Sequence, residues 1–214
     1  MDGNRRFAKE QGLETMEGHK RGREVFKECV RFVRDENIPH AVFYAFSTEN
    51  WQRTTEEVDY LMNLFTSVLK QLLQEVEEEK VRIRIIGQRQ DFSEEIQELM
   101  NEVEVKSSEY KNTTIWMALS YGGRSEIIDA VNQAVKNGGE VTEKSFKELL
   151  WTAEMPDPDM IVRTSGEKRL SNFLPWGSSY SEFLFLEKHW PALTKDDFKD
   201  ILHEYESRER RRGK

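Results

Sequence analysis

The sequence predicts a single α/β domain in which a central, mostly parallel sheet is flanked by helices. Short apolar runs alternate along the chain with amphipathic segments, and polar loops follow the apolar runs. Strands separated by helices pair in parallel through right-handed crossovers. Because 214 residues suffice for one sizeable domain and we find no internal repeat or linker, we expect one domain over residues 1–214.

The order of the elements follows from hydrophobic periodicity and from capping residues. Residues 1–16 are mostly polar and are predicted to form a loop. Strands are predicted at the apolar runs over residues 41–46, 81–86, 113–119, 160–163 and 182–186. Helices are predicted over residues 17–37, 55–79, 93–105 and 142–151, from Arg124 to residue 136, and from Thr194 to the basic tail 208–214.

Composition and charge argue against several classes of function. A net charge of -8 gives no basic field to attract a phosphate backbone, so we expect no nucleic acid partner. The single cysteine, Cys29, excludes an intrachain disulfide and suits a reducing compartment. No apolar run approaches the roughly 20 residues that span a bilayer, and no signal peptide is recognisable. We therefore expect a cytoplasmic protein.

The loop after the predicted strand 160–163 has the composition of an anion site. Arginines, hydroxyls and a glycine are concentrated within nine positions of this loop, namely Arg163, Thr164, Ser165, Gly166, Arg169 and Ser171. Guanidinium forks and hydroxyls are the donors that a diphosphate needs. One carboxylate, Glu182, follows at the start of the next apolar run. The alternative interpretation is an ordinary polar surface loop.

Other polar loops are expected at the same edge of the sheet. Ligands of open parallel sheets bind beyond the carboxyl ends of the strands, where loops 47–53, 120–124 and 163–181 would meet. The polar segment 2–6 adds Asp2. Arginines alone would indicate an anion binder, but two carboxylates, Asp2 and Glu182, also indicate Mg²⁺, which takes one or two protein oxygens together with phosphate oxygens.

These residues fall into ordered blocks. The blocks are Met1-Asp2-Gly3-Asn4-x-Arg6-x-Ala8, Gly18-His19, Tyr44-Ala45-Phe46-Ser47-x-Glu49-Asn50-Trp51-x-Arg53, Ser120-Tyr121-Gly122-Gly123-Arg124 and Arg163-Thr164-Ser165-Gly166-Glu167-x-Arg169-x-Ser171-Asn172-Phe173. Trp176, Tyr180 and Glu182 follow them. Together the blocks resemble the signature of the cis-prenyltransferases, the undecaprenyl diphosphate synthase family, over nearly the whole chain.

The resemblance implies an isoprenyl transferase that condenses isopentenyl diphosphate with an allylic diphosphate, such as farnesyl or geranylgeranyl diphosphate, and forms a cis double bond each time. It also implies Mg²⁺ as cofactor, a homodimer, and a hydrophobic tunnel for the growing chain. The predicted helix 55–79 would help to line this tunnel. The tail motif Arg211-x-Gly213 would reach toward the partner subunit, and the basic tail would favour peripheral contact with an anionic membrane.

The resemblance also assigns roles to residues. Asp2 would bind Mg²⁺ and assist departure of the allylic diphosphate, Glu182 would complete the metal site, and Asn50 would lie near the proton that leaves. The remaining residues expected to bind substrate are Gly3, Asn4, Arg5, Arg6, Phe7, His19, Ser47, Thr48, Glu49, Trp51, Arg53, Arg163, Arg169, Leu170 and Ser171. Among these, Arg163, Arg169 and Ser171 would hold the diphosphate of isopentenyl diphosphate.

The chain departs from the family pattern at several positions. The family places an apolar strand immediately before the first block, so we expect that first strand to be missing from this chain. Single residues also differ: Arg5 replaces a glycine, Phe7 a common tryptophan, Thr15 an arginine of many bacterial members, Lys168 a histidine and Gly177 a glutamine.

Two alternatives remain beside this prediction. Asp196, Asp197 and Asp200 fit the Asp-Asp-x-x-Asp motif of the all-helical trans-prenyltransferases. Those enzymes carry two such motifs, whereas this chain has one, and the strands predicted here contradict an all-helical fold. The other alternative is a non-catalytic regulatory subunit of a two-component cis-prenyltransferase, which would lack the metal aspartate and much of the arginine set. The presence of Asp2 and Arg163 favours an active enzyme.

Overall fold

The computed structural model describes residues 1–208, and the chain divides into two compact units. Unit 1 comprises residues 1–36 and 157–171 and the described chain from Gly177 onward. Unit 2 comprises residues 37–156 and 172–176. Each unit therefore combines segments that are far apart in the sequence.

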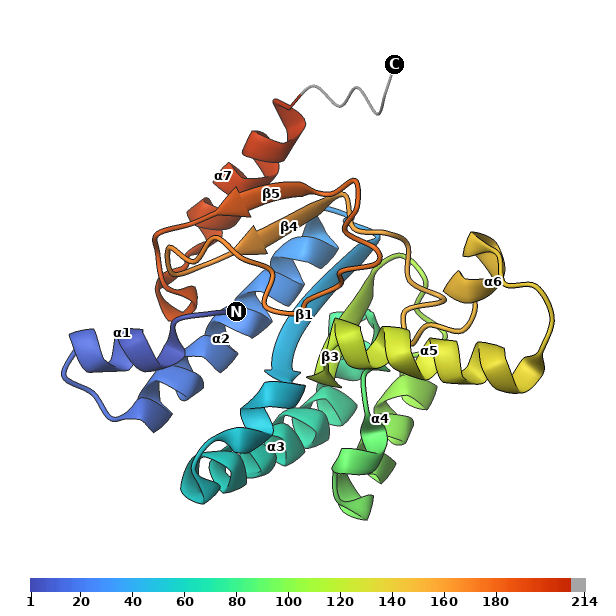
Figure 1. The fold of residues 1–214 in the computed structure, drawn as a ribbon. Helices are drawn as coiled ribbons and strands as arrows, with labels where there is room; N and C mark the ends of the chain where they lie inside the picture. The colour runs from blue at the N-terminus through green and yellow to red at the C-terminus, as the bar shows by residue number, and fades with distance from the viewer. Residues whose placement is uncertain (209–214) are drawn as a thin grey trace. The chain divides into compact units, whose positions relative to one another are not determined.

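Unit 2 is built on a three-stranded parallel sheet with the order β1-β3-β2 (Figure 1). Its strands are β1 (His40–Ser47), β2 (Arg82–Ile86) and β3 (Thr114–Tyr121). The central strand β3 is buried at every position, as expected for a parallel strand with neighbours on both sides. The register pairs Thr114 with both His40 and Arg82, so the strands start level and their carboxyl ends lie at one edge.

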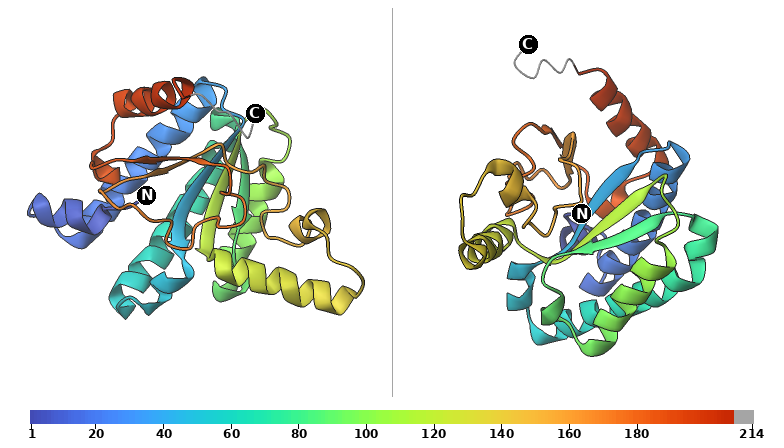
Figure 2. Two further views of the ribbon diagram at one scale, coloured as in Figure 1. Left: turned by 45° about the horizontal axis from the view of Figure 1, so that its top comes forward. Right: turned by 90° about the vertical axis from the view of Figure 1, so that its right-hand side faces the viewer.

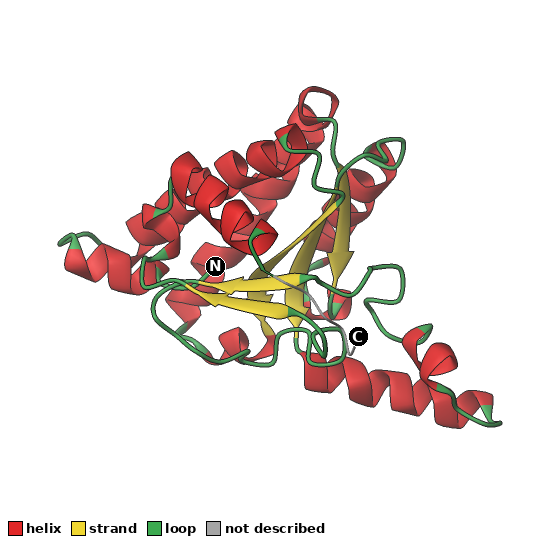
Figure 3. Ribbon diagram, turned by 90° about the horizontal axis from the view of Figure 1, so that it is seen from above, coloured by secondary structure: helices red, strands yellow, loops and turns green. Residues whose placement is uncertain are grey.

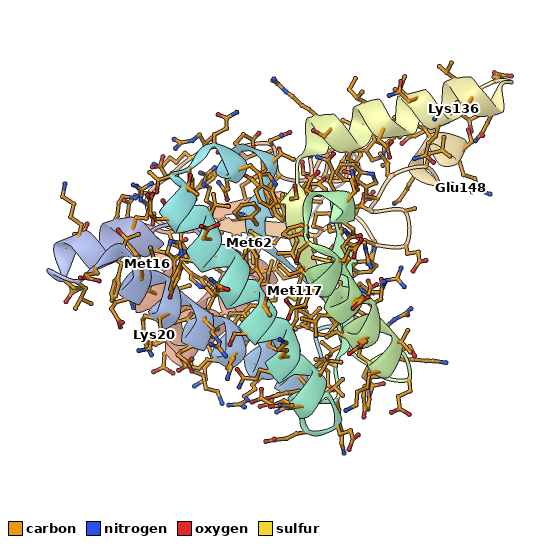
Figure 4. All side chains as sticks on the ribbon, turned by 90° about the horizontal axis from the view of Figure 1, so that it is seen from below. Met16, Lys20, Met62, Met117, Lys136 and Glu148 are labelled. Atoms are coloured by element: carbon orange, nitrogen blue, oxygen red, sulfur yellow. The ribbon has the colours of Figure 1, made fainter. Side chains whose placement is uncertain are left out.

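Helices α3 (Thr55–Glu79) and α4 (Glu94–Lys106) connect the strands of unit 2, and helices α5 (Gly123–Asn137) and α6 (Glu143–Lys147) follow β3. Short 3₁₀ turns, η1 (Thr48–Gln52) and η2 (Arg89–Asp91), follow β1 and β2. Met62 of α3 and Met117 of β3, and Lys136 near the end of α5, are labelled in Figure 4. The α3 helix begins at Thr54, whose side chain accepts a hydrogen bond from the backbone of Glu57. The helix predicted over residues 142–151 is shorter than expected and ends at Lys147, before Glu148.

Unit 1 contains helices α1 (Asn4–Glu10), α2 (Thr15–Asp35) and α7 (Lys195–Glu206), the 3₁₀ turn η3 (Trp190–Ala192), and the strands β4 (Met160–Arg163) and β5 (Glu182–Phe185). The two strands form a parallel pair, which can be followed in the views of Figure 2 and in yellow in Figure 3. Trp190 ties η3 to α2, because its indole nitrogen donates to the carbonyl of Gly22 at 2.8 Å. Phe32 of α2 packs against Phe198 of α7, with ring centroids 5.6 Å apart.

The prediction of a loop over residues 1–16 is wrong, because α1 occupies Asn4–Glu10. A helix of this length gives too few turns for its hydrophobic period to stand out, and packing on α2 stabilises it. Its only buried residue, Ala8, lies against Gly18 of α2. A Cβ on Gly18 would lie 2.1 Å from the carbonyl oxygen of Asn4, so a glycine is required for this close approach.

The predicted α/β class with parallel strands flanked by helices is confirmed. The strands belong to two parallel sheets, whereas the sequence suggested one central sheet. Among the described residues, β4 and β5 pair with each other and with no third strand. The prediction of a single domain and that of a tunnel stay predictions. In the part of the chain that the structure describes, no helix is long and apolar enough to cross a membrane.

Candidate active site

The main chain of Asp2 is fixed by the loop that follows β4. The backbone N–H of Asp2 donates to Thr164 Oγ1 at 2.9 Å. The carbonyl oxygen of Asp2 accepts from Thr164 Oγ1 at 2.8 Å, from Ser165 Oγ at 2.9 Å and from the backbone N–H of Trp190 at 3.0 Å. Thr164 and Ser165, 162 and 163 positions away in the sequence, are thereby joined to Asp2, and so is the still more distant Trp190.

Two arginines hold the carboxylate of Asp2. Arg163 Nη2 donates to Asp2 Oδ2 at 3.0 Å, and Arg6 Nη2 lies 3.3 Å from Asp2 Oδ1. Burial raises the pKa of Asp2, but the hydrogen bond from Arg163 and the charges of Arg163 and Arg6 more than offset that effect, so the pKa lies below its ordinary value. Asp2 is therefore ionised at neutral pH and offers a hard oxygen ligand.

Arg163 connects Asp2 to the rest of the loop. Its Nη1 donates to Ser171 Oγ at 2.8 Å and to the carbonyl oxygen of Arg169. The side chain of Arg163 is only 15% exposed, and its contacts with Ser171 and Arg169 lie at its solvent-exposed end. The planar guanidinium can reach Asp2 and Ser171 together because its nitrogens have fixed directions.

A second carboxylate, Glu167, lies between Arg6 and one further arginine, Arg169. Arg6 Nη1 donates to Glu167 Oε1 at 2.8 Å and to the carbonyl oxygen of Ser165 at 3.2 Å, and Arg169 Nη1 donates to Glu167 Oε2. Three guanidinium groups thus face two carboxylates in unit 1. This excess of positive charge suits an incoming anion, above all a diphosphate.

The second predicted metal ligand, Glu182, lies apart from Asp2. Glu182 Oε2 accepts from Arg208 Nη1 at 2.9 Å, at the start of β5. The register pairs Glu182 with Met160, whereas Arg163, which contacts Asp2, pairs with Phe185. Three residues of strand correspond to about 10 Å. The structure therefore brings Asp2 to Arg163 but leaves Glu182 at the other end of the strand pair.

The fit to Mg²⁺ is tested by the donors that the structure places together. Among residues 1–208 no cluster of three or more His, Cys, Asp or Glu side chains could hold a metal ion. Mg²⁺ does not need such a cluster, because it keeps waters and takes one or two carboxylates with phosphate oxygens. The ionised Asp2 beside arginines that attract a diphosphate fits this mode of binding.

The other predicted residues of unit 1 lie around the same segment. Gly3 precedes α1 with a φ of 104°, and Asn4 starts the helix. Arg5 and Phe7 lie on α1 and His19 lies on α2, while Leu170 lies in the loop between Arg169 and Ser171.

In unit 2, Ser47 and Asn50 form a reciprocal cap at the carboxyl end of β1. Asn50 Oδ1 accepts from the backbone N–H of Ser47 at 3.1 Å, while the Ser47 side chain accepts from the Asn50 backbone. With its oxygen held in this way, the amide of Asn50 presents its NH₂ group as a hydrogen-bond donor. The neighbouring Glu49 contacts Thr48 Oγ1 at 3.3 Å.

Trp51 and Arg53 are also positioned by neighbours within unit 2. Trp51 Nε1 donates to Ser120 Oγ at 2.9 Å, and Ser120 Oγ donates to Asp91 Oδ2 at 2.5 Å. Arg53 Nη1 donates to Glu57 Oε1 at 2.8 Å, and Glu57 is buried on the first turn of α3. The side chain of Arg53 is therefore oriented before any ligand arrives.

Asn172 is a structural residue of this region whose role sequence reasoning missed. The backbone carbonyl of Asn172 accepts from the backbone N–H of Gly123 at 2.8 Å, and its side-chain Oδ1 accepts from the backbone N–H of Arg124 at 2.8 Å. Asn172 therefore satisfies two donors at the start of α5. Its Nδ2 donates to Glu49 Oε1 at 3.0 Å. Burial raises the pKa of Glu49, but hydrogen bonds from its own backbone, Asn172 and neighbouring hydroxyls leave it below its ordinary value. The only signal for this role was the place of Asn172 within a block.

Comparison with known proteins decides the family. The Prenyltransf family model, which describes undecaprenyl diphosphate synthases, matches residues 1–213. The chain belongs to the undecaprenyl diphosphate synthase family. An isoprenyl transferase of Thermotoga maritima is 44% identical to this chain, and the match covers 100% of this chain and 94% of that protein. The ditrans,polycis-undecaprenyl-diphosphate synthase ((2E,6E)-farnesyl-diphosphate specific) of Micrococcus luteus is 40% identical, with 88% of its length and all of this chain covered.

Solved structures agree with this family. A probable undecaprenyl diphosphate synthase from Campylobacter jejuni superposes with a TM-score of 0.83 at 35% identity, covering 91% of this chain and 93% of that protein. Lavandulyl diphosphate synthase from Lavandula x intermedia, in complex with dimethylallyl diphosphate, superposes with a TM-score of 0.95 at 30% identity. The match covers 100% of this chain and 95% of that protein.

Membership of the undecaprenyl diphosphate synthase family confirms the predicted reaction class. The protein is an isoprenyl transferase, and its reaction is cis-prenyl chain elongation. Relatives named as transferases over their full length favour a catalytic chain over the regulatory subunit. The strands exclude the all-helical trans-prenyltransferase fold.

Proposed function

We propose that this protein adds isopentenyl diphosphate, in a Mg²⁺-dependent reaction, to an allylic diphosphate such as farnesyl or geranylgeranyl diphosphate and so makes a polyprenyl diphosphate. The observation that supports this substrate class is the ionised carboxylate of Asp2 between Arg163 and Arg6. In a site that only binds anions, a carboxylate among the arginines would weaken binding. A metal-assisted diphosphate transfer needs both the carboxylate and the arginines.

Unit 1 supplies the groups that act on diphosphates. Arg163, Arg169 and Ser171 would hold the diphosphate of isopentenyl diphosphate through charge-assisted hydrogen bonds. Asp2, with Gly3, Asn4 and Arg6 beside it, would hold Mg²⁺ and the allylic diphosphate. When bound, Mg²⁺ neutralises the negative charge that develops on the leaving diphosphate. Arginines fixed in advance stabilise the same charge at no cost of reorganisation during the reaction.

Unit 2 supplies the groups assigned to the reacting carbons. Asn50 would act near the proton that leaves, and its orientation by Ser47 restricts the amide to presenting its NH₂ group. Trp51 and Arg53 are already oriented by Ser120 and Glu57. Such preorganisation lowers the entropy that must be lost when the two substrates align.

The role of Glu182 as second metal ligand is proposed from the resemblance and needs its own test. In this structure Glu182 pairs with Arg208. Glu182→Gln should raise the Mg²⁺ concentration for half-maximal activity if the carboxylate binds the metal. An unchanged Mg²⁺ dependence would leave Asp2 as the only protein carboxylate of the metal site.

The decisive experiment is product analysis of the purified protein. Farnesyl diphosphate, labelled isopentenyl diphosphate and Mg²⁺ are incubated with the wild type, with Asp2→Asn and with EDTA added. We expect labelled polyprenyl products with cis double bonds from the wild type, and a strong loss with Asp2→Asn or EDTA. No incorporation by the wild type, or all-trans products, would refute the proposal.

The proposed homodimer is supported by an apolar stripe on α5. Ile128, Val131 and Val135 are 60%, 40% and 75% exposed, and their spacing of three and four places them on one helix face. An exposed apolar stripe marks an association surface, and most soluble oligomers are symmetric pairs of one chain. We therefore assign this face to contact with a second copy of the chain. The tail motif Arg211-x-Gly213, also expected at the subunit contact, lies outside the described residues.

Sedimentation of variants tests the dimer. Val131→Glu combined with Val135→Glu places charge on the stripe and should shift the protein to a monomer. Lys136→Glu is the matched control, because residue 136 is exposed and lies about 100° further around the helix than its neighbour Val135. A dimer that persists in the double variant would show that the subunit contact lies on another surface.

We also propose a cytoplasmic protein that binds no nucleic acid and contacts membranes only peripherally, where a lipid product leaves. The negative net charge supports the exclusion of nucleic acid, and the basic tail 208–214 supports contact with anionic lipid. Co-sedimentation with anionic and with neutral vesicles tests the membrane contact. Equal sedimentation with both vesicle types would remove the electrostatic argument.

A further inference from the structure

A chain of three polar side chains links the protein surface to the backbone of Asp2. Glu10 Oε1, at the end of α1, lies 3.0 Å from His189 Nε2. The other ring nitrogen, His189 Nδ1, lies 2.7 Å from Ser165 Oγ. Ser165 Oγ in turn donates to the carbonyl oxygen of Asp2 at 2.9 Å. All four residues belong to unit 1.

Counting hydrogens decides the direction of these contacts. Ser165 has one hydroxyl hydrogen, and the carbonyl oxygen of Asp2 can only accept. Both contacts of Ser165 are therefore made at once only when His189 Nδ1 carries a hydrogen and donates it to Ser165 Oγ. The other ring nitrogen, His189 Nε2, faces the carboxylate of Glu10.

The backbone around Ser165 holds its hydroxyl in place. Ser165 is only 6% exposed and has a φ of 75°, a conformation that non-glycine residues seldom adopt. Its N–H donates to the carbonyl of Lys188 at 3.0 Å, which ties it to the segment of His189. A strained conformation persists only where its surroundings impose it, and such positions concentrate at functional sites.

Gly3 provides the space that the Ser165 and His189 side chains occupy. A Cβ built on Gly3 would lie 2.0 Å from Ser165 Oγ and 2.7 Å from His189 Nδ1. The two atoms that meet in the hydrogen bond thus fill the empty face of the glycine that follows Asp2. The glycine allows the contact, and the contact in turn restricts the backbone that joins Asp2 to Gly3.

Ser, His and Glu in this order also occur in hydrolase triads, but the geometry here argues against that chemistry. A triad serine directs its hydroxyl to the histidine and is open to substrate. Ser165 is buried and directs its hydroxyl to the Asp2 carbonyl. The Glu10 side chain is 62% exposed, so its contact with the ring contributes little. The part that matters is therefore the inner contact, from His189 through Ser165 to Asp2.

We propose that His189 is a positioning residue that acts through Ser165 on the main chain of Asp2 and thereby keeps the Asp2 carboxylate between Arg163 and Arg6. This inference rests on the proposed function, because it matters for turnover only if Asp2 acts in the transfer. Arg163 keeps its separate contact with Ser171 when His189 is changed. The loss should therefore fall on kcat rather than on the KM for isopentenyl diphosphate.

Two substitutions of His189 separate the hydrogen bond from packing. The amide nitrogen of asparagine can occupy the position of Nδ1 and donate to Ser165, whereas that of glutamine corresponds to Nε2 and can reach only Glu10. We expect His189→Gln to lower kcat about tenfold, as for one lost hydrogen bond, with KM within about twofold. His189→Asn should stay within about threefold of the wild type. Lys20→Gln, at an exposed position on α2, is the control.

A third variant tests whether the two side chains act as one unit. Ser165→Gly removes the hydroxyl and is compatible with the positive φ, so it should lower kcat by at least the same factor as His189→Gln without backbone strain. The double variant should be no worse than Ser165→Gly alone, because His189 acts through the hydroxyl that this variant lacks. Independent, multiplying losses would overturn the proposal, as would equal losses in His189→Asn and His189→Gln.

Hydrogen–deuterium exchange tests the contact without turnover. The amides of α1 follow Asp2 directly, and Phe7 N–H donates to the carbonyl of Gly3 at 2.8 Å. These amides should exchange faster in His189→Gln and Ser165→Gly than in the wild type and in His189→Asn. The same exchange in all four proteins would overturn the positioning role. If the wild type shows no transferase activity, the proposed function fails while this exchange pattern still decides the contact.

Discussion

Arg163 is the residue whose removal should be most informative, because it contacts both the carboxylate and the loop. Its guanidinium joins Asp2 Oδ2 at 3.0 Å to Ser171 Oγ at 2.8 Å, and its side chain is only 15% exposed. Arg163→Ala should therefore remove a binding group for diphosphate and leave Asp2 with Arg6 as its remaining guanidinium partner.

The magnitude follows from the number of charged contacts. A hydrogen bond to a charged group contributes about 1.5–3 kcal/mol, and 1.36 kcal/mol corresponds to tenfold in rate, so one lost contact costs roughly ten- to hundredfold. Arg163→Ala should lower kcat/KM for isopentenyl diphosphate by about a hundredfold, since more than one contact is lost. Arg163→Lys keeps the charge but can reach Asp2 or Ser171, not both, so a loss of about tenfold is expected.

Initial rates of labelled isopentenyl diphosphate incorporation, measured at several substrate and Mg²⁺ concentrations, check these values. Arg34→Ala is the matched control, because Arg34 lies at the end of α2 beside Asp35, in an exposed ion pair of the kind that contributes little. Thermal denaturation shows whether each variant is folded. A folded Arg163→Ala protein with kcat/KM within about threefold of the wild type would refute the reasoning.

Three further predictions concern stability and reactivity. The pKa of Asp2 is lower in the folded protein than in the unfolded chain. Asp2 therefore stabilises the fold at pH values above its unfolded-state pKa, and this stabilisation is lost as the pH falls through its folded-state pKa. The difference in unfolding free energy between the wild type and Asp2→Asn should thus shrink below about pH 4 in urea titrations. Burial raises the pKa of Cys29 to about 12, so iodoacetamide should label the native thiol far more slowly at pH 8 than the urea-unfolded one, as mass spectrometry can show. Buried Glu126 accepts from Tyr121 and from Thr152, so Glu126→Ala should lower the unfolding free energy by about 3 kcal/mol in urea titrations and Glu126→Gln by less; equal effects would contradict the hydrogen-bond argument.

The sequence by itself determined the succession of strands along the chain, the family and the candidate residues. The alternation of apolar runs with amphipathic segments predicts parallel strands, and this local pattern is present in the chain before it folds. The strands over residues 41–46, 81–86 and 113–119 were therefore predicted to within a few residues. The motif blocks likewise named Asp2 and Arg163 without any knowledge of their distance.

Only the tertiary structure decided which of these residues touch. Contacts across about 160 positions, such as Asp2 with Ser165, depend on loop conformations with positive φ that no short-range pattern encodes. The α1 helix depends on a glycine of α2 for its packing, so its own sequence predicted only a loop. His189 carried no signal at all, because a histidine beside Trp190 becomes informative only when Ser165 and Glu10 are brought to its two ring nitrogens. Residue types follow from the sequence, whereas hydrogen-bond partners follow from how distant segments pack.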